Sequence, residues 1–202
     1  MSEKPAPTTV PLAELLARRW SARAIDAAQP VSRADCMALL EAARWAPSCF
    51  GDQPWRFVVW DRFRDQESWA QASIALAEGN RVWANAAPVL ILVAAAGTFR
   101  QNGRDNRWAQ YDSGAAAENL CLQATELGLV VHQMGGFDVE IIAQVAGLPA
   151  EVRPMAMIAV GHPAPVEVLP EALRERELAP RTRLPLAELF FDGRYGLGFA
   201  AD

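Results

Sequence analysis

Two groups of arginine residues near opposite ends of the sequence are suited to binding a phosphate group. The first lies in the segment RWSAR (19–23), and the second lies in RTR (181–183). A guanidinium group can hold a phosphate through paired N–H donors, and a serine hydroxyl such as that of Ser21 can add another hydrogen bond. On spacing alone, each group is more typical of a solvated charged face than of a ligand site.

The segment APSCFGDQPW (46–55) is the other candidate, because it places the thiol of Cys49 among turn-forming residues directly after a helical pattern. It is either a plain loop that contains a thiol, or a loop whose backbone lies against a flat ligand, with or without a reactive Cys49. A cysteine–histidine catalytic pair would require a cysteine near His132 or His162. The sequence supplies no group to orient either histidine, so structural roles are favoured for both.

Composition and missing motifs argue against several other classes of function. The sequence contains no P-loop, dinucleotide-binding, zinc-protease or serine-hydrolase signature. A net charge of −5 disfavours general nucleic-acid binding. Three widely spaced cysteines and two histidines are unlike a disulfide framework or a zinc site, and they favour a reducing cytoplasm. The first ten residues lack a signal-peptide core, and the longest apolar run, 86–97, is too short to span a bilayer, so no membrane partner is expected.

Hydrophobic periodicity predicts helices that alternate with about four strands. The composition, with 51% hydrophobic and 21% charged residues, is typical of a soluble globular domain. The expected helices are residues 11–19, a segment from Ser32 to a stop at Pro47, residues 64–78, residues 108–127 and a segment capped by Asp138. The expected strands are residues 56–60, 88–94, 155–161 and 130–138, the last running into a Gly-Gly turn. The pattern predicts a single three-layer domain of the α/β or α+β class over residues 1–202, with 1–9 as a flexible N-terminus and 165–202 as a C-terminal extension.

Four separated segments together resemble the FMN-dependent nitroreductase family. RWSAR (19–23) is similar to the family's R-x-S-x-[RK] segment, and APSCFGDQPW (46–55) is similar to its A-P-S-S-x-N-x-Q-P-W loop. HQMGGFD (132–138) resembles the turn beside the flavin ring, and RTRLPL (181–186) resembles the C-terminal [RK]-x-R segment. Their order and spacing agree from about Leu12 to Leu186. The resemblance implies the α+β class, with a three-layer α/β/α nitroreductase-like fold in which helices flank a central, mainly antiparallel sheet, and it implies a homodimer.

The resemblance also implies one FMN in each of two sites at the subunit interface. Segment 19–23 would contact the phosphate and the pyrimidine edge of the ring, segment 181–183 would hold the phosphate, and the turn at 134–136 would lie beside flavin N5. Loop 47–53 would lie along the flavin or the ribityl chain, from the same or the partner subunit, while Trp55 is equally suited to anchoring the core. Asn80 and Asn85 are weaker candidates, since capping of turns or helix ends explains them equally well. The cofactor-binding residues that the resemblance assigns are Arg19, Trp20, Ser21, Arg23, Pro47, Ser48, Cys49, Gln53, Met134, Gly135, Gly136, Arg181 and Arg183.

The activity implied by the resemblance is a ping-pong oxidoreduction in which NADH or NADPH reduces FMN, and a nitroaromatic, quinone or similar small acceptor then reoxidises it. This chemistry requires no catalytic side chain and no metal. The alternatives are a specialised reductase of one small metabolite, such as an aldehyde or enoate, a flavin-binding protein with little turnover, and a flavin-free structural dimer. Two positions depart from the family pattern: Gly51 replaces the usual Asn, which puts cofactor affinity in question, and Cys49 replaces the usual Ser. We expect Cys49 to pack near the flavin without a covalent role.

Overall fold

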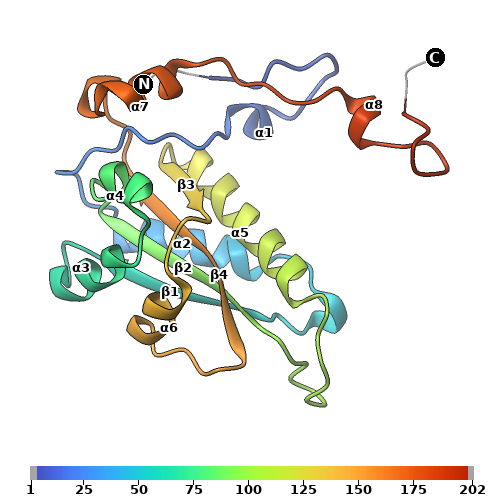
Figure 1. The fold of residues 1–202 in the computed structure, drawn as a ribbon, viewed down its shortest axis with the longest axis horizontal. Coiled ribbons are helices and arrows are strands. Elements are labelled where there is room, and N and C mark those ends of the chain that lie inside the picture. Colours follow the sequence, from blue (N-terminus) through green and yellow to red (C-terminus); the bar gives the residue numbers. More distant parts are fainter. Residues whose placement is uncertain (1–3, 200–202) are drawn as a thin grey trace.

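The computed structural model describes residues 4–199, in which a single four-stranded sheet forms the centre (Figure 1). The strands are β1 (Trp55–Asp61), β2 (Val89–Ala96), β3 (Val130–Met134) and β4 (Val152–Gly161). Their order in the sheet is β1-β2-β4-β3, and every neighbouring pair is antiparallel. The helices are α1 (Glu14–Arg18), α2 (Arg33–Arg44), α3 (Gln66–Ile74), α4 (Glu78–Ala84), α5 (Ala109–Glu126), α6 (Val139–Val145), α7 (Glu171–Leu178) and α8 (Leu186–Leu189), with 3₁₀ turns η1 (Cys49–Gly51) and η2 (Val166–Val168).

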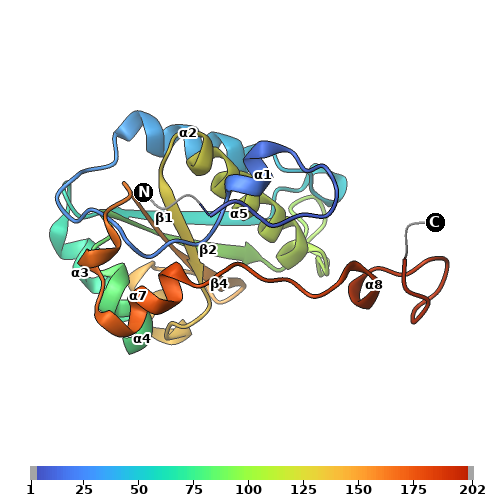
Figure 2. The same cartoon turned by 90° about the horizontal axis from the view of Figure 1, so that it is seen from above.

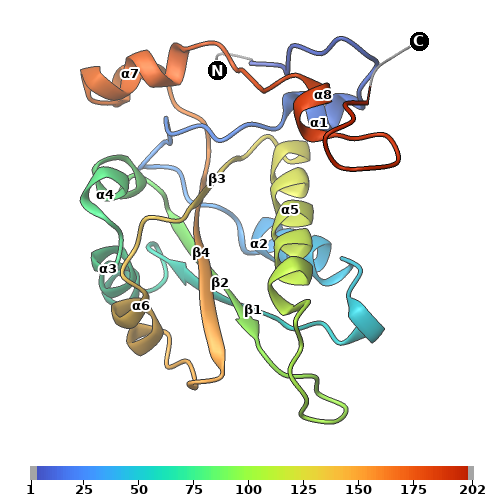
Figure 3. The same ribbon diagram turned by 45° about the vertical axis from the view of Figure 1, so that its right-hand side comes forward.

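Helices cover both faces of the sheet, as the three-layer prediction requires. Along β2, Leu90 and Leu92 lie in the core shared with α3, α4 and α6, whereas Val89 and Ile91 lie in the core shared with α2 and α5. Figures 1 and 3 show these two helix layers on opposite sides of the sheet. Because both faces of the strand are covered, the run 88–94 is continuously apolar rather than alternating. The α+β fold class and the antiparallel sheet are therefore confirmed.

Local sequence signals set several of the helix ends. Ser32 caps α2 by accepting a hydrogen bond from the Asp35 N–H at 3.0 Å. Asp138 caps α6 by accepting hydrogen bonds from the Glu140 N–H at 3.0 Å and the Ile141 N–H at 2.9 Å. A capping side chain satisfies N–H groups that have no partner within the helix. These two helix starts are confirmed.

The helix expected over 64–78 is wrong, because two helices separated by a short extended piece occupy this region. Helix α3 ends at Ile74, and α4 begins at Glu78. Between them, the Ala77 N–H donates to the Gly136 carbonyl at 3.0 Å, and the Asp138 N–H donates to the Ala75 carbonyl at 2.7 Å. This pairing with a distant turn removes residues 75–77 from the helix. Two other boundaries differ as well: α1 is shorter than 11–19 and has no side-chain cap at Ala13, and β3 stops before the two glycines.

The N-terminal segment and the C-terminal extension lie together at one end of the sheet. The Ala6 N–H donates to the Ala17 carbonyl at 2.8 Å, and Lys4 Nζ donates to the Glu177 carbonyl at 2.6 Å. Beyond α7 the chain runs out past the body of the molecule to α8 (Figure 2). The flexible N-terminus stays a prediction; residues 1–3 of that segment and residues 200–202 of the predicted extension lie outside the described residues. Within residues 4–199, no helix is long and apolar enough to cross a bilayer.

Candidate functional site

Guanidinium groups from the two arginine segments gather where the chain ends meet. Arg19 follows α1 directly, and Arg181 follows α7 and donates from Nη1 to the Lys4 carbonyl at 2.7 Å and the Ala17 carbonyl at 2.8 Å. Burial lowers the pKa of Arg181, and the positive charges of Arg19 and Arg183 lower it further. The positive charges of Arg19, Arg181 and Arg183 are therefore held near one another, and backbone carbonyls fix the position of Arg181. Such a group favours the binding of an anion between them.

One carboxylate, that of Glu118 on α5, partly compensates this charge. Arg19 Nε lies 3.4 Å from Glu118 Oε1. Burial raises the pKa of Glu118, and the charge of Arg19 opposes that rise. Among the described contacts of Arg19, Arg181 and Arg183, the carboxylate of Glu118 beside Arg19 is the one negative charge, since Arg181 and Arg183 donate to backbone carbonyls.

The other residues of the segment RWSAR have different partners. The backbone N–H of Arg23 donates to Glu177 Oε1 at 2.8 Å, and its guanidinium Nη1 lies 3.6 Å from Glu177 Oε2. In this structure Glu177 therefore compensates the charge of Arg23, a residue that the family resemblance assigned to the cofactor. Trp20 is half-buried beneath Lys4, whose Nζ lies 4.6 Å from the centre of the ring, and Ser21 Oγ lies 3.5 Å from Arg19 Nη1.

His132 is a structural residue that joins strand β3 to the segment 19–23. Its Nδ1 donates to the Ala22 carbonyl at 3.1 Å, and its ring centre lies 4.6 Å from that of Trp83. Burial lowers the pKa of His132 to about 4, and the nearby charges of Arg23 and Arg19 act in the same direction. His132 is therefore neutral near pH 7 and is not a charged ligand group.

The turn after β3 brings backbone, not side chains, to the surface. Met134 is buried, whereas Gly135 and Gly136 are exposed. Asn80 Nδ2 donates to the Gly136 carbonyl at 2.9 Å, and a Cβ atom added to Gly136 would lie 2.8 Å from that nitrogen. A Cβ atom on Gly135 would meet no atom within 4 Å. Asn80 thus lies against the predicted flavin turn, while Asn85 is the C-cap residue of α4.

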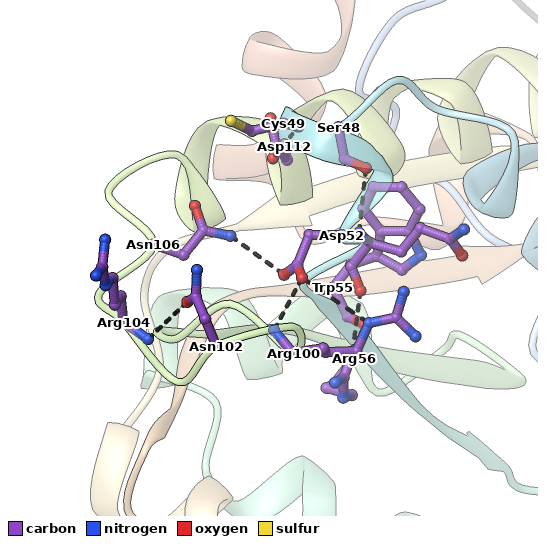
Figure 4. A network of polar contacts seen from close by, with 11 residues as sticks. Ser48, Cys49, Asp52, Trp55, Arg56, Arg100, Asn102, Arg104, Asn106 and Asp112 are labelled. Atoms are coloured by element: carbon purple, nitrogen blue, oxygen red, sulfur yellow. Dashed lines mark hydrogen bonds and ion pairs between the residues drawn. The ribbon is translucent and has the colours of Figure 1, made fainter.

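The loop 46–55 is built from internal hydrogen bonds and two buried carboxylates (Figure 4). Ser48 Oγ accepts from the Gln53 N–H at 3.1 Å, and Asp112 Oδ2 accepts from the Cys49 N–H at 3.0 Å. Gly51 has φ of +66°, in the left-handed region that glycine adopts freely and that asparagine tolerates better than most residues. Gly51 in place of the usual Asn therefore suits the backbone of this loop.

Sequence reasoning missed the carboxylates that hold these segments in place, namely Asp52, Asp112, Glu118 and Glu177. Asp52, Asp112 and Glu177 are acidic yet 6%, 4% and 3% exposed, respectively. The only available signal was an acidic residue inside a turn-rich loop or on an otherwise apolar helix face, and this also describes many solvated residues. Trp55, by contrast, is 8% exposed and belongs to the core beneath α2 and α5, as one of its two interpretations required.

Comparison with known proteins identifies the family. The model of the family described as "Nitroreductase family" matches residues 16–162 of this chain. The chain belongs to the nitroreductase family. A solved structure described as an oxidoreductase containing FMN is 35% identical in sequence to this nitroreductase-family chain, with a TM-score of 0.88. The match covers 94% of this chain and 96% of the chain in that structure.

Curated relatives lie in bacteria and archaea. A 15.4 kDa protein of Mycolicibacterium smegmatis, named by its position in the ask 5′ region, is 44% identical over 60% of this chain and 80% of its own length. A protein of Archaeoglobus fulgidus named "Putative NADH dehydrogenase/NAD(P)H nitroreductase" is 30% identical over 66% of this chain and 75% of its own. These matches confirm the predicted family.

In this nitroreductase-family chain, the predicted site residues form two groups along α5. Arg19 is tied to α5 at Glu118, and Cys49 is tied to it at Asp112, six residues and about 9 Å of helix away. Within residues 4–199, the side-chain hydrogen bonds that tie loop 46–55 to distant segments reach Asp112, Arg100 and Asn106. No hydrogen bond joins the loop to Gly135 or Gly136 in this range. His132 thus joins segment 19–23 to β3 within this chain, whereas no hydrogen bond in residues 4–199 joins the loop to the glycine turn.

Proposed function

We propose that this chain is an FMN-dependent oxidoreductase that passes a hydride from NADH or NADPH to a nitroaromatic, quinone or similar small acceptor by a ping-pong mechanism. The observation that carries the proposal is the convergence of Arg19, Arg181 and Arg183 from opposite ends of the chain. A phosphate monoester carries a charge of about −1.5 to −2 near pH 7. Three guanidinium groups opposed by the carboxylate of Glu118 leave about two positive charges, which fits such a group.

The glycine turn supports the same cofactor. Flavin N5 needs a hydrogen-bond partner and close access, and an exposed backbone without Cβ atoms supplies both. Gly136 already approaches Asn80 so closely that a Cβ would lie 2.8 Å from its amide nitrogen, while the space around Gly135 is open. We propose that Met134, Gly135 and Gly136 present backbone to the ring, with Asn80 fixing the position of Gly136.

When bound, FMN supplies the hydride chemistry, accepting from the nicotinamide and delivering to the acceptor. The protein's residues bind and orient it. Arg19, Ser21, Arg181 and Arg183 hold the phosphate, and Arg23 is kept close by Glu177 for the pyrimidine edge. Loop residues Pro47, Ser48, Cys49 and Gln53 border the ring or ribityl chain, and Trp20 packs behind the phosphate segment.

We further propose a homodimer in which each site is completed by the partner subunit. The loop 46–55 has no hydrogen bond to the glycine turn of its own chain within the described residues. The C-terminal extension also runs out beyond the body (Figures 1 and 2) with apolar side chains that are each more than half exposed: Leu184, Leu186, Leu189, Phe190, Leu197 and Phe199. Burial of this surface against a second copy would stabilise the assembly by about 25 cal/mol per Å² of apolar area. A cytoplasmic location remains part of the proposal.

Steady-state kinetics with NADH or NADPH and a quinone acceptor test this function. A ping-pong enzyme gives parallel lines in double-reciprocal plots at several fixed acceptor concentrations, and lines that intersect would contradict the mechanism. A yellow protein that neither nicotinamide reduces would favour the alternative of a flavin-binding protein with little turnover. A protein that stays colourless after incubation with FMN would favour the alternative of a flavin-free structural dimer.

A further inference from the structure

The loop 46–55 holds a backbone conformation that its own residues disfavour. Phe50 has φ of +54° and Gln53 has φ of +53°, and neither is glycine. A residue with a Cβ atom in this region costs on the order of 1 kcal/mol or more, and it persists where surrounding contacts fix it. The contacts that fix this loop therefore determine how it presents Ser48 and Cys49.

The strongest of these contacts is made by Asp52, whose side chain is 5% exposed (Figure 4). Its Oδ1 accepts from the Arg100 N–H at 2.9 Å, and its Oδ2 accepts from Asn106 Nδ2 at 3.3 Å. Both donors belong to the loop at 97–107. The Arg100 Nε lies 3.9 Å from the same Oδ1. A buried carboxylate with several donors from one loop binds that loop tightly, because loss of a donor weakens the compensation of a buried negative charge.

The tie continues from Asn106 to helix α5. Asn106 Oδ1 accepts from the Trp108 N–H at 3.1 Å, and Trp108 is the N-cap residue of α5. Asp112, in the first turn of the same helix, accepts from the Cys49 N–H at 3.0 Å. The loop 46–55 is thus held at Cys49 by the first turn of α5 and at Asp52 by the loop 97–107, whose Asn106 in turn contacts the N-cap residue of α5.

The two loops also touch through aromatic rings. The ring centres of Phe50 and Phe99 lie 5.9 Å apart in an edge-to-face arrangement. Phe50 is 82% exposed, so this contact alone does not bury it. A pair of this kind is worth about 0.5–1.5 kcal/mol, less than a buried charge-assisted network.

We propose that Asp52 is a positioning residue: its buried carboxylate joins the loop 46–55 to the loop 97–107 and so holds Ser48 and Cys49 in the conformation that borders the flavin. This inference rests on the proposed function, because it assumes that the loop contacts FMN. It adds a residue outside the cofactor-binding set, and it makes the loop 97–107 part of the support of the site.

The test uses an exchanged pair. In Asp52→Asn, the new Oδ1 still accepts from the Arg100 N–H, but the new amide meets the Asn106 amide donor against donor. In the double variant Asp52→Asn with Asn106→Asp, one carboxylate oxygen at 106 accepts from the amide at 52 while the other accepts from the Trp108 N–H. The matched control is Asp105→Asn, which removes an exposed charge from the same loop.

Titration of the full-length apoprotein with FMN and with riboflavin measures the effect. We expect Asp52→Asn to raise the Kd for both ligands on the order of tenfold, since about one net hydrogen bond to a charged group is lost and the loop borders ring and ribityl rather than phosphate. The double variant should return both Kd values to within about threefold of wild type, and Asp105→Asn should leave them unchanged.

Hydrogen exchange of the apoprotein is the second readout. Peptides covering 46–55 and 97–107 should both exchange faster in Asp52→Asn and recover in the double variant. A purely structural Asp52 would lower the Tm of the apoprotein and the FMN complex equally without moving Kd, and that result would overturn the proposal. An unchanged Kd for Asp52→Asn, or a raised Kd that the double variant does not restore, would overturn it as well.

Failure of the proposed function gives a different pattern. If the wild-type protein binds neither FMN nor riboflavin, the proposed function is wrong, and so is the claim that Asp52 positions a flavin-contacting loop. Hydrogen exchange that becomes faster in both loops in Asp52→Asn and recovers in the double variant would still establish that Asp52 couples the two loops. Faster exchange in only one of the loops would contradict that coupling.

Discussion

The two neighbouring glycines of the β3–α6 turn differ in what an added methyl group would meet, and this difference yields a prediction about folding. At Gly136, a Cβ atom would lie 2.8 Å from Asn80 Nδ2 and 3.5 Å from the Ala77 Cβ. At Gly135, it would meet no atom within 4 Å. Neither glycine has positive φ, so alanine suits the backbone at both positions.

The magnitude follows from the hydrogen bond that the methyl group would displace. Alanine at position 136 forces the Asn80 amide away from the Gly136 carbonyl, to which it now donates at 2.9 Å. A hydrogen bond of this kind is worth about 0.5–1.5 kcal/mol net. Replacement of glycine also stabilises by about 0.4–1 kcal/mol through the unfolded chain, equally at both sites. We therefore expect Gly136→Ala to be about 1 kcal/mol less stable than Gly135→Ala, or about 2–4 °C in Tm for a chain of this length.

Thermal and urea unfolding of the apoproteins measure the difference. In an Asn80→Ala background the displaced amide is absent, so the two alanine variants should become equally stable. A difference that persists without Asn80, or a Gly135→Ala variant that is the less stable of the two, would refute the reasoning. The same pair tests the site: Gly135→Ala should leave folding intact yet raise the Kd for FMN, because its methyl group would enter the space next to the proposed flavin ring.

Three further changes test other parts of the site. The pKa of His132 in the folded state, about 4, lies below its usual value near 6.5, so the unfolded chain takes up the proton first as the pH falls. The contribution of this group to the free energy of unfolding is therefore full above pH 6.5 and is lost as the pH falls toward 4. His132→Asn should therefore reduce the slope of the unfolding free energy between pH 6.5 and 4 by at most about 1.4 kcal/mol per pH unit, measured by urea titration against wild type; equal slopes would contradict the burial of an uncharged ring. Cys49→Ser should keep FMN affinity and turnover within about threefold, since its backbone N–H makes the bond to Asp112, and a loss on the order of a hundredfold would indicate a chemical role for the thiol. At φ of +66°, Gly51→Asn should cost less than about 1 kcal/mol and Gly51→Val distinctly more, and equal Tm values for the two variants would count against the left-handed backbone.

Much of the fold follows from local sequence, because the period of apolar residues and the end signals agree with the final packing. The run 88–94 is apolar throughout because β2 has helices on both faces, and Asp138 caps the helix that the sequence places after it. The division between α3 and α4 could not be predicted in this way. It depends on residues 75–77 pairing with the turn at 136–138, which lies about sixty residues further along the chain.

The site divides in the same manner. Segments 19–23, 46–55, 132–138 and 181–186 could be found because each has a recognisable set of residues. The carboxylates that support them could not, since Glu177 lies on a strongly charged helix whose sequence does not reveal that this one side chain is buried. The partner of each polar group is set by tertiary packing, which no local pattern encodes.

The most direct test of the account is an anaerobic titration of the FMN-loaded protein with NADH and, separately, with NADPH. The account requires the visible flavin absorbance to disappear with one equivalent of at least one nicotinamide per bound FMN, and to return on addition of a quinone. Protein that binds FMN in stoichiometric amount and keeps its colour with excess of both nicotinamides would contradict it.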